Sequence, residues 1–206
     1  MKKNNYPGKF IVFEGLDGSG QTTQANLLKK FLEKRGFKVL LTKEPTKDNE
    51  FGKRVDRILQ YKERSSPLEL QKLFIKDRDW HLKNVIEPAL KEGKIVISDR
   101  YFFSTFAFGG IDVDMEKLIK MNDNFLMPDI SIFLDVKPKT CISRIEGRSQ
   151  KTGERKTIFE KEKLLEKVYK NYLVLLKKFP LVRINGQRSI EDVHKEIKEI
   201  VIKKIK

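Results

Sequence analysis

Five short apolar stretches alternate with longer amphipathic stretches along this chain. The apolar stretches predict buried strands at Lys9–Gly15, Phe37–Pro45, Lys94–Arg100, Asp129–Val136 and Phe179–Gly186. Between them, Leu, Val and Phe recur at spacings of three and four, which is typical of helices with one face against a core. This alternation predicts an α/β fold with a five-stranded parallel sheet between two layers of helices. Ligands are then expected at the carboxyl ends of the strands.

Two of the predicted helices have recognisable ends. The helix Thr22–Gly36 follows a glycine-rich turn and stops at a glycine, with Lys and Arg in its last turn. The helix Ser66–Gly93 begins with Ser-Pro, a pair that suits the cap and the first helical position. No repeat, linker or low-complexity segment interrupts the alternation, so the 206 residues predict one domain, 1–206.

The turn after the first strand reads FEGLDGSGQTTQ and nearly matches a phosphate-binding P-loop. In the pattern G-x-x-x-x-G-K-[ST], Gly15, Gly20 and Thr22 are in register, whereas Gln21 occupies the lysine position. Two glycines could merely tighten a turn, but these lie between a buried strand and a helix, where backbone N–H groups can bind phosphate. We therefore expect a nucleotide phosphate site lined by Gly15, Leu16, Asp17, Gly18, Ser19, Gly20, Gln21, Thr22 and Thr23.

A carboxylate follows the third predicted strand. The segment KIVISDRY runs an apolar strand directly into Asp99, as in P-loop proteins whose carboxylate holds the water shell of Mg²⁺. An ordinary strand-end carboxylate is the alternative, although it leaves Arg100 unexplained. With the hydroxyl of Thr22, Asp99 predicts a magnesium site.

Five segments together resemble the thymidylate kinase family, which makes dTDP from dTMP and ATP: FEGLDGSGQTTQ, TKEP, LFIKDRDWH, PALKEGKIVISDRYFFST and PDISIFLDV. The resemblance extends from Lys9 to about Tyr172. It implies a P-loop kinase of nucleotide biosynthesis that uses ATP and Mg²⁺, with ATP and dTMP as its small-molecule partners, and a homodimer. The alternatives are a kinase for another nucleoside or nucleotide, and a binding-only protein inactivated by Gln21.

The resemblance also implies an acceptor site. Phe74 would stack on thymine, with core packing as the alternative, and Arg78, one helical turn later, would donate to the carbonyl edge of the base. Arg100 would grip the monophosphate as a fork, and Asp17 would orient either Arg100 or the sugar hydroxyl. The residues expected around dTMP are Glu44, Phe74, Arg78, Arg100, Ser104, Thr105 and Phe108, the last in place of a common tyrosine of the family.

Positive charge is concentrated towards the C-terminus. The net charge is +15, and residues 137–206 hold 20 Lys and Arg against 9 Asp and Glu. The run RIEGRSQKTGERK lacks apolar periodicity after Ile145, so we interpret it as a cation-rich loop. The resemblance, to the branch of the family with a basic lid, implies that this run is a short lid at about 144–158 that closes over the ATP phosphates. We expect the lid to supply the charge that Gln21 lacks.

The expected roles of these residues can be stated together. The lid residues expected at ATP are Arg144 and Arg148. The catalytic residues are expected to be Asp17, Arg100, Arg148 and Arg155.

The same composition argues against other classes of protein. Nucleic acid is not an expected partner, because the few aromatic residues of the basic third fall on helical core spacing. No membrane contact is expected, since no apolar run approaches the roughly 18 residues of a span. Cys141 is the single cysteine, which excludes an internal disulfide and favours a reducing cytoplasm.

Overall fold

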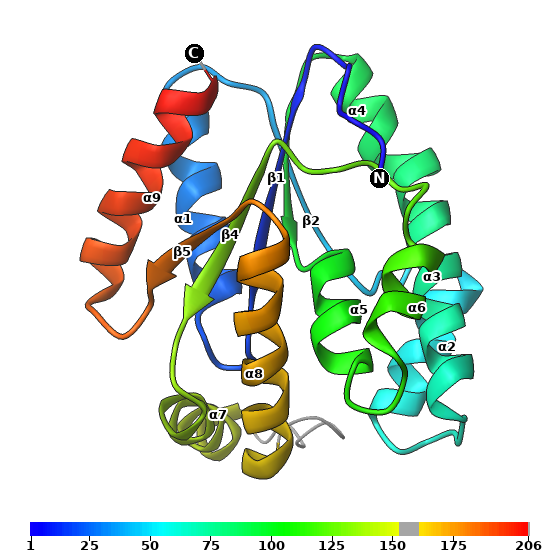
Figure 1. The fold of residues 1–206 in the computed structure, drawn as a ribbon. Coiled ribbons are helices and arrows are strands. Elements are labelled where there is room, and N and C mark those ends of the chain that lie inside the picture. The colour runs from blue at the N-terminus through cyan, green and yellow to red at the C-terminus, as the bar shows by residue number, and fades with distance from the viewer. Residues whose placement is uncertain (153–160, 206) are drawn as a thin grey trace.

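A five-stranded parallel sheet forms the centre of the molecule, as the alternation predicts (Figure 1). This computed structural model describes residues 1–152 and 161–205, with residues 151 and 152 described by their backbone only. The strands are β1 (Lys9–Gly15), β2 (Val39–Lys43), β3 (Ile95–Asp99), β4 (Ile130–Asp135) and β5 (Leu181–Asn185). Their order in the sheet is β2-β3-β1-β4-β5, so β1 lies at the centre.

Helices connect the strands. They are α1 (Gln21–Glu33), α2 (Glu50–Leu59), α3 (Pro67–His81), the π-helical segment η1 (Leu82–Ile86), α4 (Glu87–Lys91), α5 (Phe102–Gly109), α6 (Met115–Met121), α7 (Pro138–Thr152), α8 (Glu162–Lys178) and α9 (Ile190–Ile205). The predicted helix Ser66–Gly93 thus continues through η1 into α4. Its cap is present, since the Ser66 hydroxyl accepts a bond from the backbone N–H of Glu69.

The helices cover both faces of the sheet (Figure 1). In β1, Phe10 and Val12 belong to the core beneath α5 and α8, whereas Ile11 and Phe13 belong to the core beneath α1 and α9. Successive strand residues point to opposite faces, so an unbroken apolar run is what a strand covered on both sides requires. This explains why the strands were visible in the sequence.

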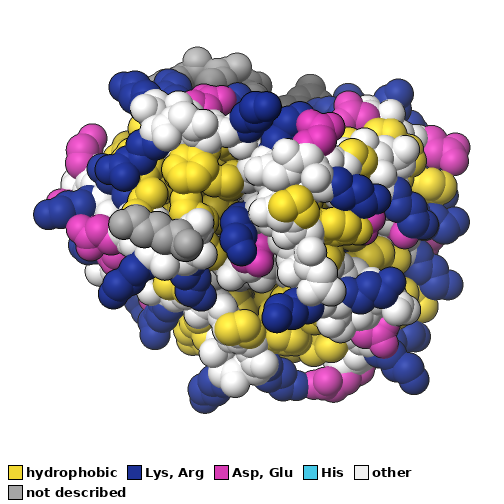
Figure 2. Space-filling model, turned by 90° about the horizontal axis from the view of Figure 1, so that it is seen from above, with side chains coloured by type: hydrophobic (Ala, Val, Ile, Leu, Met, Phe, Trp, Pro, Cys, Tyr) yellow, Lys and Arg dark blue, Asp and Glu magenta, His cyan; other side chains and the backbone are white. Residues whose placement is uncertain are grey.

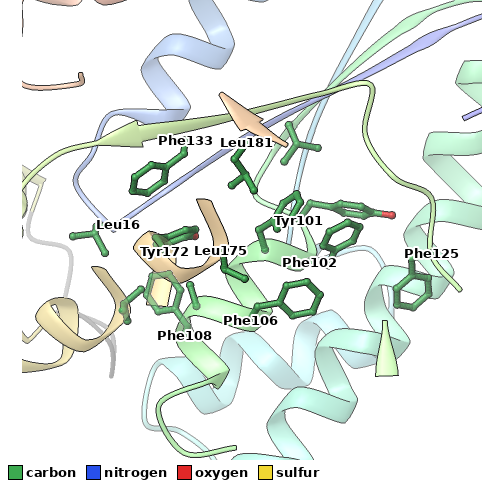
Figure 3. Close-up of a cluster of buried hydrophobic side chains, with 14 of the residues drawn as sticks. Leu16, Tyr101, Phe102, Phe106, Phe108, Phe125, Phe133, Tyr172, Leu175 and Leu181 are labelled. Carbon is green, nitrogen blue, oxygen red and sulfur yellow. The ribbon is translucent and has the colours of Figure 1, made fainter. Parts of the chain in front are cut away.

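Aromatic side chains fill much of the core on the α5 and α8 face (Figure 3). Tyr172 of α8 stacks on Phe133 of β4 with 4.8 Å between ring centroids, and Phe108 stands edge-on to Tyr172 at 6.5 Å. Leu16, the residue after β1, is fully buried at the same end of this cluster. The turn after β1 therefore rests on close-packed rings, which limits its movement.

The lid interpretation requires one correction. Arg144 and Arg148 lie on α7, so this part of the predicted loop is helical. Cys141 and Ile145, one turn apart, are both fully buried and give α7 an apolar side. These two apolar residues lie at or before the start of the cation-rich stretch, and no apolar spacing continues after Ile145, so the sequence pattern did not predict the helix. Arg155 and the rest of the predicted lid beyond Thr152 lie outside the described residues.

Both signs of charge are spread over one end of the molecule. Figure 2 looks onto the end of the molecule away from the carboxyl ends of the strands, and Lys and Arg are scattered over it with Asp and Glu between them. Within 1–152 and 161–205, no helix has the length and apolarity that crossing a bilayer requires.

Candidate functional site

The turn between β1 and α1, which the sequence predicts to be a phosphate loop, is built on glycine. Gly18 and Gly20 have φ angles of 82° and 99°, in the left-handed region that side chains disfavour. A Cβ at Gly18 would also lie 2.6 Å from the carbonyl oxygen of Cys141 on α7. The glycines thus allow the tight turn, and Gly18 allows the loop to lie directly against α7.

A cleft of about 540 Å³ opens over this loop. Eleven residues expected at the site from the sequence line it: Asp17, Gly18, Ser19, Gly20, Gln21, Thr22, Thr23, Asp99, Arg100, Arg144 and Arg148. Leu16 does not line it because its side chain lies in the core. Gly15 is likewise not a lining residue, but its carbonyl accepts a bond from Arg100.

Sequence reasoning missed one wall of this cleft. The missed lining residues are Gln24, Lys43, Gly186, Arg188, Ile190 and Val193. Gly186 and Arg188 lie in the segment that joins β5 to α9, and Ile190 and Val193 lie at the start of α9. The signal was the Asn-Gly pair that ends the predicted strand Phe179–Gly186, since the carboxyl ends of parallel strands meet at one edge of the sheet.

The two residues expected to hold Mg²⁺ touch one another. The Thr22 hydroxyl donates to Asp99 Oδ2 at 2.5 Å, and Lys43 Nζ lies 3.4 Å from the same oxygen. The pairing of β1 with β3 places Asp99 opposite Phe13, which brings these ends together. A hydroxyl and a carboxylate are oxygen ligands of the kind that Mg²⁺ prefers, so the pair fits this ion.

Arg100 reaches from the end of β3 to the phosphate loop. Its Nη1 donates to the carbonyl oxygen of Gly15 at 2.8 Å and to the hydroxyl of Ser104 at 3.0 Å, and its Nη2 donates to Asp17 Oδ1 at 2.6 Å. The contact expected between Asp17 and Arg100 is therefore present. The ring of Phe108 lies 5.1 Å from the guanidinium carbon.

A buried carboxylate, absent from the expected site, supports this arginine. Glu14 accepts bonds from the backbone N–H of Tyr101 at 2.9 Å, the hydroxyl of Ser104 at 2.6 Å and the hydroxyl of Tyr172 at 2.9 Å. Burial raises the pKa of Glu14 to about 7, although the bond from Ser104 and the charge of Arg100 oppose the shift. Its sequence signal was a charged residue within the apolar strand KFIVFEG.

Arg78 lies in a buried polar network and is 1% exposed. Its Nε donates to Glu44 Oε2 at 2.8 Å, Nη1 to Asn122 Oδ1 at 2.7 Å and Nη2 to the hydroxyl of Thr105 at 3.0 Å. His81 Nδ1 lies 3.2 Å from the other oxygen of Glu44. The structure thus brings Glu44, Arg78 and Thr105 together, and their contact with the base stays a prediction.

Phe74 lies one turn before Arg78 on α3. It is half-buried and packs against a small apolar cluster made of Val55, Ile58, Leu70 and Leu73. The core-packing alternative therefore accounts for part of this side chain. Stacking on the base remains a prediction for the rest of it.

Comparison with known proteins agrees with this geometry. A family model described as thymidylate kinase matches residues 13–197. The chain belongs to the thymidylate kinase family. This confirms the resemblance and the P-loop α/β fold expected from the sequence.

Relatives from several organisms match nearly the whole chain. A probable thymidylate kinase of Pyrococcus horikoshii is 44% identical, over 94% of this chain and 96% of the relative. One from Thermococcus gammatolerans is 41% identical, over 96% and 98%. A thymidylate kinase of Desulfotalea psychrophila is 35% identical, over 94% of each. The match to the family model thus includes all the residues that line the cleft.

Proposed function

We propose that this chain transfers the γ-phosphoryl group of ATP to dTMP, giving ADP and dTDP for dTTP synthesis. The bond from the γ-phosphorus to its bridging oxygen breaks with the electron pair left on ADP, and an oxygen of the dTMP phosphate forms the new bond. The observation that carries the proposal is Arg100 on the phosphate loop, 2.8 Å from the carbonyl oxygen of Gly15. An acceptor phosphate held there meets the donor phosphates in line.

The donor side is supported by α7 as well as by the loop. Arg144 Nη1 lies 3.4 Å from the carbonyl oxygen of Ser19, and its Nη2 donates to the carbonyl oxygen of Gly186 at 3.2 Å. Arg148, one turn further, lines the same cleft. These two cations and the loop N–H groups would bind the ATP phosphates, with Arg155 as a further candidate outside the described residues.

Mg²⁺ is the expected metal. Thr22 and Asp99 would hold it against the ATP phosphates, where it would neutralise charge that develops during the transfer. Their own contact, at 2.5 Å, keeps both oxygens at the edge of the cleft before the nucleotide arrives.

On the acceptor side, the proposed dTMP site consists of Glu44, Phe74, Arg78, Arg100, Ser104, Thr105 and Phe108. Asp17 orients Arg100. The relatives' names favour dTMP over another nucleotide and favour an enzyme over a binding-only protein. A homodimer and a cytoplasmic location stay predictions from the resemblance and from the single cysteine.

The test is an ADP-release assay with Mg·ATP and one acceptor at a time. We expect turnover with dTMP, less with dUMP, and a sharp fall for UMP, CMP and GMP. A reaction without acceptor gives the background rate. No ADP release with dTMP would contradict the proposed function, and equal rates for all five acceptors would contradict the assignment of the base pocket.

A further inference from the structure

Gln21 occupies the position at which a P-loop carries its lysine, and its side chain is buried, with 5% exposed. Its Nε2 donates to the carbonyl oxygen of Gly15 at 3.3 Å. Its Oε1 accepts bonds from the hydroxyl of Ser19 at 3.1 Å and from Arg100 Nη2 at 3.3 Å. Both ends of the Gln21 amide therefore form hydrogen bonds, within the loop and with Arg100, which directly follows β3.

The contact with Arg100 requires an acceptor at position 21. Asp17 Oδ1, the carbonyl oxygen of Gly15 and Gln21 Oε1 all accept from this guanidinium, so the loop surrounds it with oxygen atoms. A lysine has three donors and no acceptor, and its ammonium would repel the guanidinium instead. Glutamine at this position is thus compatible with an arginine resting on the loop.

We propose that Gln21 is a positioning residue that holds Arg100 on the phosphate loop. The guanidinium of Arg100 then takes the place of a loop lysine. Its positive charge faces the phosphoryl group while this group is transferred from ATP to dTMP. The inference deepens the proposed function and rests on it. Phe108 and Ser104 flank Arg100 as well, so Gln21 completes a fork that is fixed before substrate binds.

Two substitutions separate this role from a direct contact between Gln21 and ATP. Gln21→Met keeps the length of the side chain but removes the amide oxygen, so Arg100 loses one of its hydrogen-bond acceptors. We expect the Kd and KM for dTMP to rise about three- to tenfold, while the KM for Mg·ATP changes by less than about twofold.

Gln21→Glu keeps the acceptor and adds a negative charge near the ATP phosphates. Here the KM for Mg·ATP rises and the Kd for dTMP stays close to that of the unchanged protein.

A third substitution tests the charge directly. Gln21→Lys restores the P-loop pattern but places an ammonium beside Arg100, so we expect kcat to fall and the Kd for dTMP to rise. If Gln21 were only a weak stand-in for lysine, this variant would be faster than the unchanged protein. Lys30→Ala, on the exposed side of α1, is the matched control and should leave all constants unchanged.

The measurements are steady-state kinetics with each substrate varied in turn and calorimetric titration with dTMP. An increase in the KM for Mg·ATP alone in Gln21→Met, or a faster Gln21→Lys, would overturn the inference. An unchanged protein without dTMP-dependent ADP release would instead overturn the proposed function. Thermal unfolding identifies any of the three Gln21 variants that fails to fold. The dTMP titrations of the two variants that do fold then test the inference.

Discussion

At the scale of single residues, Arg100 is the residue on which the site depends. Its φ of 75° lies in the left-handed region that residues other than glycine seldom adopt. Two hydrogen bonds stabilise this backbone conformation. The backbone N–H of Arg100 donates to the carbonyl oxygen of Phe13 at 2.9 Å, and the Ser98 hydroxyl donates to the carbonyl oxygen of Arg100 at 2.7 Å. Strain held by surrounding bonds is common at functional sites, because it fixes a side chain that would otherwise move.

Replacing Arg100 should separate the two substrates. Arg100→Ala removes the fork on the monophosphate but leaves the loop N–H groups, so we expect kcat/KM for dTMP to fall about 10³-fold or more. ATP affinity, measured by titration without dTMP, should change by less than about threefold. The control is Arg54→Ala, because Arg54 forms an ion pair with Glu63 at the surface. A comparable loss of ATP affinity would show that Arg100 does not belong to the acceptor side.

The buried Glu14 should make stability depend on pH. Its pKa is about 7 in the folded protein against an ordinary 4.5, so the folded state binds the proton more tightly than the unfolded state. The free energy of unfolding therefore falls as the pH rises through this window, by on the order of 3 kcal/mol in total. Glu14→Gln cannot ionise and should lose this slope.

Denaturant unfolding at intervals from pH 4.5 to pH 8 measures this effect. The difference in free energy between Glu14→Gln and the unchanged protein should shift in favour of the variant as the pH rises. Glu33→Gln, on the exposed end of α1, should show no such shift. Parallel pH curves for the unchanged protein and Glu14→Gln would mean that folding leaves the pKa of Glu14 unchanged.

At the scale of elements, the sequence was informative where burial follows a simple pattern. All five strands were found because both faces of the sheet are covered and their residues form unbroken apolar runs. The helix α5 was not predicted, because its residues FFSTFAFG are buried on almost every side and give the helix no polar face. The contacts of Glu14, and the contact of Gln21 with Arg100, could not be predicted either, since they join residues far apart in sequence through side-chain geometry.

The helical part of the lid leads to a prediction about charge. Arg144 contacts the loop and the β5–α9 segment from α7, so Arg144→Ala should raise the KM for Mg·ATP and lower kcat about 10²- to 10³-fold. The KM for dTMP should change less, because the proposed acceptor fork is Arg100, which directly follows β3. Lys139→Ala changes an exposed cation on the same helix and is the control. Equal losses in both variants would indicate a general effect of charge instead of a contact with ATP.

At the scale of the whole molecule, the question is what a net charge of +15 does. Nucleic-acid binding requires cations and aromatic rings gathered on one surface. Here Tyr172 and Phe108 lie within the core, and Lys and Arg are scattered even over the end away from the site (Figure 2). Cations therefore also cover the end of the molecule away from the site, and the cations that line the cleft are Lys43, Arg100, Arg144, Arg148 and Arg188.

This distribution predicts that substrates, and not polynucleotides, respond to the charge. Each nucleotide is small enough to enter the cleft, so its KM should rise moderately as salt screens the attraction. A single-stranded oligonucleotide, followed by fluorescence anisotropy, should bind weakly at about 50 mM salt and leave the ATP reaction unaffected at physiological salt, because scattered cations release few counterions together. Submicromolar binding that falls steeply with salt and blocks ATP turnover would contradict this, and would mean that the basic surface is itself a binding site.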